Sequence, residues 1–201
     1  MDIGALILMG GKNSRMNGNV KGLLKIKNIT FLEKIQETLN DFSSIYLSIN
    51  DKFSKEQKQN FENMGFKIIE DIYKEIGPLG GIYSSLLNCK EEYLFITACD
   101  MPFITKNSIE VLCNKVDKNT DGVVFYDKNN KLYPLGAIYS KNVLPIIEEM
   151  IEKKYYKLSY LIEKSNFVKI NIEKTDINLK VLSNINTPQE YDSLINKKSL
   201  F

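Results

Sequence analysis

The sequence predicts an α/β fold, a three-layer α/β/α arrangement around a doubly wound, mostly parallel sheet with a short antiparallel excursion. As far as Val116, apolar runs of strand length alternate with stretches of helical periodicity, a pattern typical of βαβ units. Capping motifs precede several of the helical stretches. Further along, two strand-like runs flank a short turn, which indicates an antiparallel pair.

The first part of the chain predicts the order βαβαβ. Residues 3–9 form an apolar run of strand length, as expected of a strand covered on both faces. Thr30 and Glu33 have the spacing of a capping box, so a helix is predicted to begin at Thr30. The following elements are a strand at 45–49, a helix at 54–64, in which Ser54 and Gln57 repeat the capping spacing, and a strand at 66–69.

The second part predicts further alternation and then a looser pattern. After the glycine-rich segment 77–81 a helix is predicted to run through Leu86 and Leu87. The last helix is predicted to start at Thr187-Pro188, because Glu190 completes a strong start signal there. Between them we expect a strand at 93–98, a turn at 99–102, a helix at 108–116, strands at 122–126 and 133–139 around the turn 128–130, helical structure at 143–151 and a strand at 168–172.

Composition narrows the possible functions. The chain has 201 residues, is 43% hydrophobic and 26% charged, and shows no linker or repeat, so one domain over residues 1–201 is expected. The net charge is only +2 and the lysines are spread along the chain, which argues against a nucleic-acid partner. No apolar stretch approaches the roughly 18 residues of a membrane span, so we expect no membrane partner and a cytoplasmic location.

The absence of histidine removes several classes of active site. With no histidine in the chain, Ser-His-Asp triads, Cys-His dyads and histidine metal ligands are excluded. Cys89, Cys99 and Cys113 have neither CxxC spacing nor an even count, so they are interpreted as reduced thiols. Carboxylates, Lys, Arg and a metal ion remain as catalytic groups.

The segment between Ala5 and Lys21 is typical of a phosphate-binding loop. An apolar strand leads into glycines whose backbone N–H groups can point at anionic oxygens, and Lys12, Arg15 and Lys21 add positive charge. The spacing fits neither a P-loop nor the dinucleotide fingerprint. The alternative is a basic strand-to-helix turn, but about a dozen residues is long for a connection that usually takes ~2 to 6. A nucleotide is therefore the expected ligand.

Acidic residues follow two predicted strands. In open α/β sheets ligands bind beyond the carboxyl ends of the strands, where Asp71 and Asp100 stand. Mg²⁺ prefers one or two protein oxygens together with phosphate oxygens, so Asp100 is the predicted magnesium ligand. Its alternative is a turn or capping aspartate, and that of Asp71 is a solvated strand exit. Cys99 has no histidine to activate it and is interpreted as a small buried residue.

Seven short motifs follow one another over nearly the whole chain: Leu8-Met9-Gly10-Gly11, Ser14-Arg15-Met16 with Lys21, Ile69-Glu70-Asp71, Gly77-Pro78-Leu79-Gly80-Gly81, Cys99-Asp100-Met101-Pro102, Tyr133-Pro134-Leu135 and Asn186-Thr187-Pro188. In order and spacing they resemble the molybdenum cofactor guanylyltransferase family. The wider group of nucleotidyltransferases shares the glycine-rich start with its Arg-Met and Lys, and the segment 77–81 favours the guanylyl member over the cytidylyl one.

The resemblance implies a fold like that of the nucleotide-diphospho-sugar transferases (GT-A-like) and a set of site residues. The backbone of Leu8, Met9 and Gly10 would contact the nucleotide, Arg15 and Lys21 its phosphates, Asp71 its guanosine part, and Asp100 a Mg²⁺ ion. Arg15, Lys21 and Asp100 form the predicted catalytic set. Ser48 or Asn50 stands where the family places a polar nucleotide contact, and Lys12 is interpreted as a solvated loop lysine. Two departures are Met9 for the usual alanine and Val20 where an aspartate often precedes the lysine.

The resemblance also implies the reaction: transfer of GMP from Mg·GTP to the phosphate of molybdenum-bound molybdopterin, with release of pyrophosphate. Partners would be GTP, molybdenum-molybdopterin, and molybdopterin-inserting and molybdoenzyme-maturation proteins. One alternative is another nucleotidyltransferase, acting with CTP on molybdopterin or on a sugar or polyol phosphate. The other is a non-catalytic nucleotide-binding module.

Overall fold

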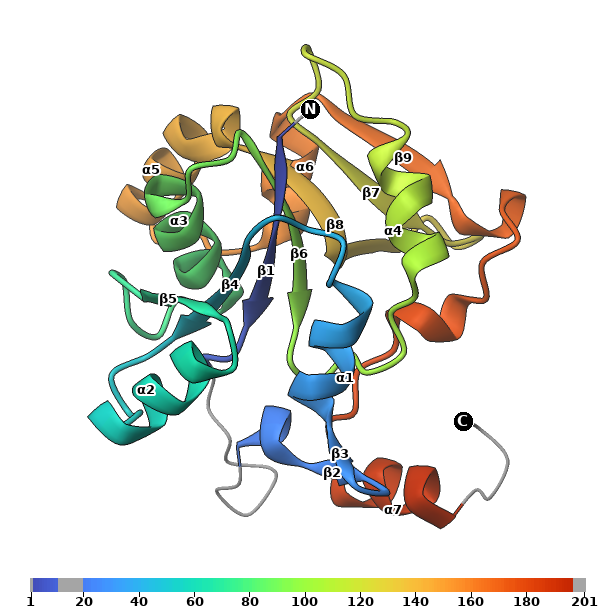
Figure 1. Cartoon of the computed structure of the whole chain (residues 1–201). Coiled ribbons are helices and arrows are strands. Elements are labelled where there is room, and N and C mark those ends of the chain that lie inside the picture. The colour runs from blue at the N-terminus through green and yellow to red at the C-terminus, as the bar shows by residue number, and fades with distance from the viewer. Residues whose placement is uncertain (1, 11–19, 197–201) are drawn as a thin grey trace.

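The computed structural model describes residues 2–10 and 20–196, and Figure 1 shows a central sheet with helices packed against it. These residues form a seven-stranded sheet in the order β5-β4-β1-β6-β8-β7-β9. Strands β5, β4, β1 and β6 are parallel, β8 is antiparallel to β6 and β7, and β9 is parallel to β7. The predicted sheet with an antiparallel excursion is confirmed. The strands are β1 (Ile3–Leu8), β4 (Ile45–Ile49), β5 (Lys67–Glu70), β6 (Tyr93–Ala98), β7 (Gly122–Tyr126), β8 (Leu132–Ser140) and β9 (Phe167–Asn171).

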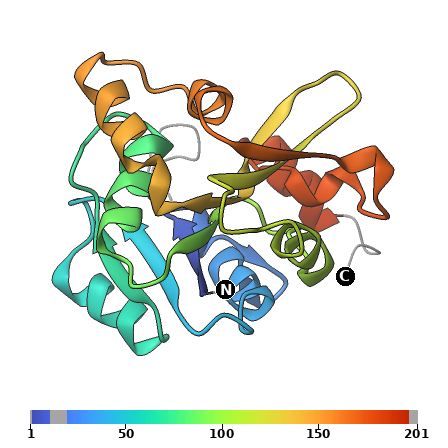
Figure 2. The same cartoon turned by 90° about the horizontal axis from the view of Figure 1, so that it is seen from above.

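Helices cover both faces of the sheet, as the view from above shows (Figure 2). Ala5 and Ile7 of β1 face one core, shared with α1, α2 and α4, and Leu6 and Leu8 face a second core, shared with α3, α5 and α6. This alternation makes β1 apolar throughout and confirms the three layers. The helices are α1 (Phe31–Thr38), α2 (Lys55–Asn63), α3 (Pro78–Asn88), α4 (Lys106–Cys113), α5 (Leu144–Glu152), α6 (Leu158–Lys164) and α7 (Pro188–Asn196). Among the helices that the described residues form, none combines the length and apolarity needed to cross a bilayer.

Helix starts followed the capping signals, with two corrections. The boxes at Thr30 and Ser54 are present, with both reciprocal hydrogen bonds. The helix predicted at 108–116 begins earlier, because Thr105 is its N-cap and Ser108 the partner that completes the box. The glycines of segment 77–81 do not all precede a helix: Gly77 is the N-cap at φ 67° and Pro78 is the first helical residue, so Gly80 and Gly81 lie inside α3.

A small hairpin, which the sequence did not predict, packs against the C-terminal helix. Strands β2 (Lys25–Ile26) and β3 (Ile29–Thr30) pair directly after the 3₁₀ helix η2 (Lys21–Leu23). Two-residue strands are too short to show the alternation of apolar and polar residues from which a strand is predicted. A small core formed by Ile26, Phe31, Ile185 and Leu194 packs this hairpin against α7. Helix α6 was likewise not predicted.

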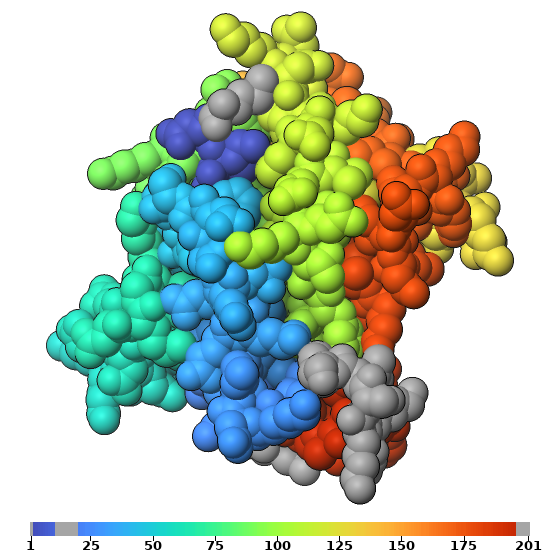
Figure 3. All heavy atoms as spheres, turned by 45° about the vertical axis from the view of Figure 1, so that its right-hand side comes forward, coloured from blue at the N-terminus to red at the C-terminus, as the bar shows by residue number. Residues whose placement is uncertain are grey.

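The chain after β9 returns along the face that carries α4. In Figure 3 the orange segment beyond β9 lies beside the yellow-green α4. Ile172, Ile177, Val181 and Leu182 belong to the same core cluster as α4, and the 3₁₀ helix η5 (Leu179–Leu182) forms part of this segment. This route carries the chain back to the carboxyl edge of β6, where Ile185 N donates to Asp100 O at 2.8 Å.

Candidate active site

Three strands end side by side at one edge of the sheet. In the register Leu8 of β1 is opposite Ser48 of β4 and Ala98 of β6. The residues that follow are held there by the backbone, since Met9 N donates to Ser48 O at 2.9 Å and Cys99 N donates to Leu8 O at 3.0 Å. The predicted site residues of these three strands therefore lie along one rim.

Lys21 forms the centre of the first group of site residues. Its Nζ donates to Asp100 Oδ2 at 2.8 Å and to Asn186 Oδ1 at 2.7 Å. The side chains of Lys21 and Asp100 are only 16% and 11% exposed, so this ion pair is screened by solvent far less than a surface pair. In the sequence Asn186 stands out only as part of the family pattern, and its place directly before a helix start predicts the helix but not this contact with Lys21.

Asp100 has one oxygen left over. Its Oδ1 is buried and has no hydrogen-bond partner among the described residues. Those residues contain no group of three or more His, Cys, Asp or Glu side chains that could hold a metal ion. A single carboxylate oxygen is what Mg²⁺ takes when phosphate oxygens and water complete its octahedron, so the residues present fit the predicted ion.

A second group of site residues surrounds Asp71. Ser48 Oγ donates to Asp71 Oδ1 at 2.6 Å. A Cβ on Gly10 would lie 2.8 Å from Asp71 Oδ2, and one on Gly81 would lie 2.5 Å from Ser48 Oγ. Both positions therefore need glycine to keep space in front of this carboxylate. Burial raises the pKa of Asp71, and the hydrogen bond from Ser48 partly offsets this.

Asn50 lies near the same group, but its side chain bonds to the local backbone and not to Asp71. Its Oδ1 accepts a hydrogen bond from Lys52 N at 3.1 Å, and its own backbone N would be 4.0 Å from a Cβ on Gly10. Ser48 is buried, whereas Asn50 is half-buried. Ser48 is thus the member of this pair that contacts Asp71.

The two departures from the family pattern have a packing explanation. The side chain of Met9 is 3% exposed and lies in the core of the α1 face, and half-buried Val20 packs against the same core. Leu8 is also buried, so only the backbone of Leu8 and Met9 can face a ligand. Lys12 and Arg15 lie outside the described residues.

The environment of Cys99 makes its thiol unreactive. Its side chain is buried, and burial first, then the charge of Asp100, raises the pKa of the thiol to about 12. The thiolate, which is the reactive form, is therefore negligible at neutral pH. The interpretation of Cys99 as a small buried residue is consistent with this environment.

Comparison with known proteins places the chain among nucleotidyltransferases. A profile of the MobA-like NTP transferase domain matches residues 5–167. The chain belongs to this family. A protein of Clostridium perfringens (strain 13 / Type A) described as a probable molybdenum cofactor guanylyltransferase is 36% identical over 204 residues, covering 98% of both chains. One of Flavobacterium johnsoniae with the same description is 35% identical over 190 residues, covering 94% of both.

Solved structures agree with the fold of the MobA-like family. The molybdopterin-guanine dinucleotide biosynthesis protein A of Archaeoglobus fulgidus superposes with a TM-score of 0.78 at 23% identity, covering 94% of this chain and 95% of that one. A CMP:2-keto-3-deoxy-manno-octonic acid synthetase complexed with CTP superposes with a TM-score of 0.73 at 12% identity, covering 97% of both chains. The chain is a nucleotidyltransferase of molybdenum cofactor biosynthesis with the predicted nucleotide-diphospho-sugar transferase type of fold. Asn186 and α7 lie beyond the matched MobA-like segment.

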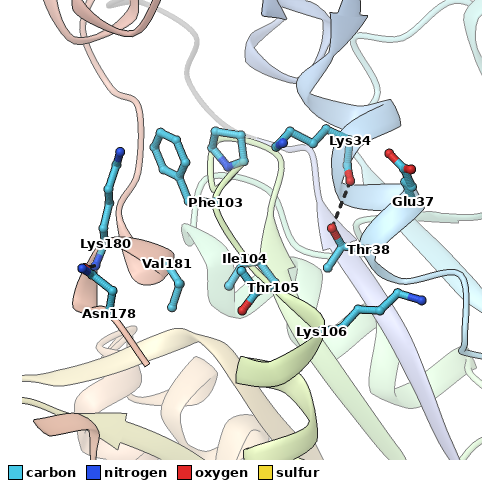
Figure 4. Close-up of a pocket in the computed structure, with 11 residues that line it drawn as sticks. Lys34, Glu37, Thr38, Phe103, Ile104, Thr105, Lys106, Asn178, Lys180 and Val181 are labelled. Carbon is cyan, nitrogen blue, oxygen red and sulfur yellow. Dashed lines mark hydrogen bonds between the residues drawn. The ribbon is translucent and has the colours of Figure 1, made fainter. Parts of the chain in front are cut away.

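A separate cavity of about 570 Å³ opens between α1, the segment after β6 and η5 (Figure 4). Two of its lysines are already engaged: Lys106 Nζ donates to Asn40 Oδ1 and Asp41 Oδ2, both at 2.7 Å, and Lys180 Nζ lies 4.6 Å from the centre of the Phe103 ring. The candidate active site of this MobA-like protein therefore remains at Lys21 and Asp100. The cavity is lined by Lys34, Glu37, Thr38, Pro102, Phe103, Ile104, Thr105, Lys106, Asn178, Lys180 and Val181.

Proposed function

We propose that this nucleotidyltransferase transfers GMP from Mg·GTP to the phosphate of molybdenum-bound molybdopterin and releases pyrophosphate. The names of the relatives support the guanylyl group and the cofactor pathway. The observation that carries the proposal is the buried Oδ1 of Asp100, which has no partner in the part of the chain that the structure describes and lies next to the Lys21 ammonium. A cation and a free carboxylate oxygen at one strand edge are suited to a metal-bound triphosphate.

Lys21, Arg15 and Asp100 would act at the phosphates. Asp100 Oδ1 would hold Mg²⁺, which when bound neutralises phosphate charge and orients the α-phosphate. An ammonium has three donors, and Lys21 uses two of them on Asp100 and Asn186. The third has no acceptor among residues 2–10 and 20–196 and would be available for a phosphate oxygen. Arg15 would add a second cation from the glycine-rich loop.

The group around Asp71 would hold the guanosine part. Ser48 occupies Oδ1 of Asp71, which leaves Oδ2, on the side of Gly10, to accept a hydrogen bond from the nucleoside. The backbone of Leu8, Met9 and Gly10, and Asn50 beyond β4, would complete the contacts to the nucleotide.

The reaction then needs no general base from the protein. A terminal phosphate on the acceptor is largely ionised at neutral pH, so its oxygen can attack the α-phosphorus in line. Negative charge grows on the bridging oxygen toward the departing pyrophosphate, where Lys21 and Arg15 would stabilise it. The lack of histidine is compatible with this chemistry.

A pyrophosphate-release assay tests the proposal. The four nucleoside triphosphates are compared with and without molybdenum-molybdopterin, across a Mg²⁺ titration and with EDTA. We expect release with GTP that requires both the acceptor and Mg²⁺. A preference for CTP would indicate a cytidylyl enzyme, and tight GTP binding without Mg²⁺ dependence or pyrophosphate would indicate a binding module. Either outcome contradicts the proposal.

A further inference from the structure

Helix α7 is connected to Lys21 by a chain of hydrogen bonds. Lys21 Nζ donates to Asn186 Oδ1 at 2.7 Å, and Asn186 N donates to Glu190 Oε2 at 2.6 Å. We propose that Glu190 is a positioning residue for nucleotidyl transfer, because it fixes Asn186 and through it the ammonium of Lys21. This inference rests on the proposed function, in which Lys21 contacts the phosphates.

Glu190 does more than cap its own helix. Its Oε2 also accepts from Thr187 N at 3.0 Å, and Glu190 N donates to Thr187 Oγ1 at 3.2 Å, which is the reciprocal pattern of a capping box. The bond from Asn186 N is additional and is the shorter of the two that Oε2 accepts. This bond contributes most to lowering the pKa of Glu190, and the positive charge of Lys21 lowers it further.

The capping box of α2 provides a comparison. In α2, Ser54 N donates to Gln57 Oε1 at 2.9 Å and Gln57 N to Ser54 Oγ at 3.2 Å. No bond from the preceding Phe53 N to Gln57 accompanies them in the structure. Gln57 therefore makes the local contacts of a capping residue without the link to a catalytic side chain, and glutamine is sufficient at this position.

Helix α7 is itself held against the chain that follows Lys21. Tyr191 Oη donates to Lys25 O at 2.6 Å, and the Tyr191 ring meets that of Phe31 edge-on at 6.1 Å. Figure 1 shows α7 beside β2 and β3. One helix thus constrains the backbone just after Lys21 and, through Asn186, the end of its side chain.

This double constraint matters for transfer because lysine has a long, flexible side chain. Without a fixed Asn186, the ammonium would lose one of its two anchors and sample other rotamers. A displacement of about 1 Å near reacting groups can cost up to ~100-fold in rate. Since Asp100 would still hold the ammonium, we expect a loss of about tenfold.

The test compares Glu190→Ala with Gln57→Ala, the matched capping variant of α2. Both should lower the melting temperature, because each removes one capping side chain, and Glu190→Ala should lower it somewhat more, because the bond from Asn186 N is lost as well. Only Glu190→Ala should lower kcat, by about tenfold and by more than it raises the KM for GTP. Glu190→Gln should keep most of the rate, since a glutamine amide oxygen can also accept the bonds from Asn186 N and Thr187 N. Asn186→Ala and the double variant Asn186→Ala/Glu190→Ala should be equally slow.

A second measurement needs no activity. The rate at which acetic anhydride labels Lys21 in the nucleotide-free protein, followed by mass spectrometry, should rise in Glu190→Ala and Asn186→Ala and stay at the wild-type value in Gln57→Ala. The proposal is overturned if labelling of Lys21 is unchanged in Glu190→Ala, if both capping variants have the same kcat, or if the losses of the double variant multiply. A wild-type protein without transfer would instead contradict the proposed function, and the labelling would still decide the role of Glu190.

Discussion

The pair Lys21 and Asp100 should contribute to folding as well as to turnover. Both side chains are mostly buried, at 16% and 11% exposed. Removing one partner of such a pair leaves an uncompensated charge and costs about 3–5 kcal/mol. Asp100→Ala leaves the Lys21 ammonium with the Asn186 amide oxygen as its one hydrogen-bond acceptor among the described residues. At roughly 2–4 °C per kcal/mol for a chain of this size, the melting temperature should fall by ~6–20 °C.

Lys21→Met should be destabilised by a similar amount, because it strands the Asp100 carboxylate. In Lys21→Met/Asp100→Ala neither charge remains, so the double variant should be more stable than the sum of the single losses predicts, by about 2 kcal/mol or more. Urea unfolding followed by circular dichroism measures the three free energies of unfolding. Additivity within ~0.5 kcal/mol would show that the pair is not coupled and would refute the reasoning.

Asp100→Asn separates folding from catalysis. The amide oxygen can still accept the bond from Lys21 Nζ, although the counter-charge is lost, so Asp100→Asn should be destabilised less than Asp100→Ala. The amide nitrogen would then stand in the place of Oδ1 and cannot bind a metal ion. Turnover should fall by several orders of magnitude, to the level of Asp100→Ala, even at saturating Mg²⁺. Near-normal pyrophosphate release by Asp100→Asn would exclude the metal role of Asp100.

Two further predictions concern the group around Asp71. Burial raises the pKa of Asp71, so its ionised form destabilises the fold as the pH rises above about 4. Asp71→Asn should therefore have a higher melting temperature than wild type at pH 7, and this difference should vanish near pH 3.5. A melting-temperature difference that persists at pH 3.5 would contradict the role of the buried charge. The variant should also bind GTP more weakly. Gly81→Ala would bring a Cβ to 2.8 Å from Leu8 Cδ2 and 2.5 Å from Ser48 Oγ, so unfolding by urea should show a loss of ~1–3 kcal/mol, with weaker GTP binding. Its control in the same helix is Ser85→Ala, which removes a buried hydroxyl that has no partner among the described residues and should not destabilise the protein.

The layers of the fold were predictable because the signals were local. An apolar run such as β1 and a capping box such as that of α1 are written in consecutive residues. The β2–β3 hairpin and α6 were missed for the opposite reason. Their stability comes from packing with distant segments, as shown by the small core that Ile26 shares with Leu194 of α7. Tertiary packing overrides weak local preference in both places.

The placement of the candidate residues was predictable at the ends of strands, but not where the chain returns to the sheet after β9. Asp71 and Asp100 were identified because polar residues at the carboxyl ends of parallel strands meet at one rim. The pairing of Ser48 with Asp71 needed the register of β4 and β5, in which Ser48 stands opposite Ile69. Asn186 reaches Lys21 across 165 positions of sequence. No periodicity links residues so far apart.

Asn186 also shows that a sequence motif can indicate one role, the start of a helix, while the structure gives the same residues a second one. In the sequence it stands before a threonine, a proline and a glutamate, a combination that predicts only where a helix starts. In the structure the same glutamate holds Asn186 N while the Asn186 side chain meets Lys21. Helix initiation and placement of a catalytic cation thus depend on one carboxylate. A change at Glu190 that preserves the cap but releases Asn186 should therefore impair transfer more than it impairs folding.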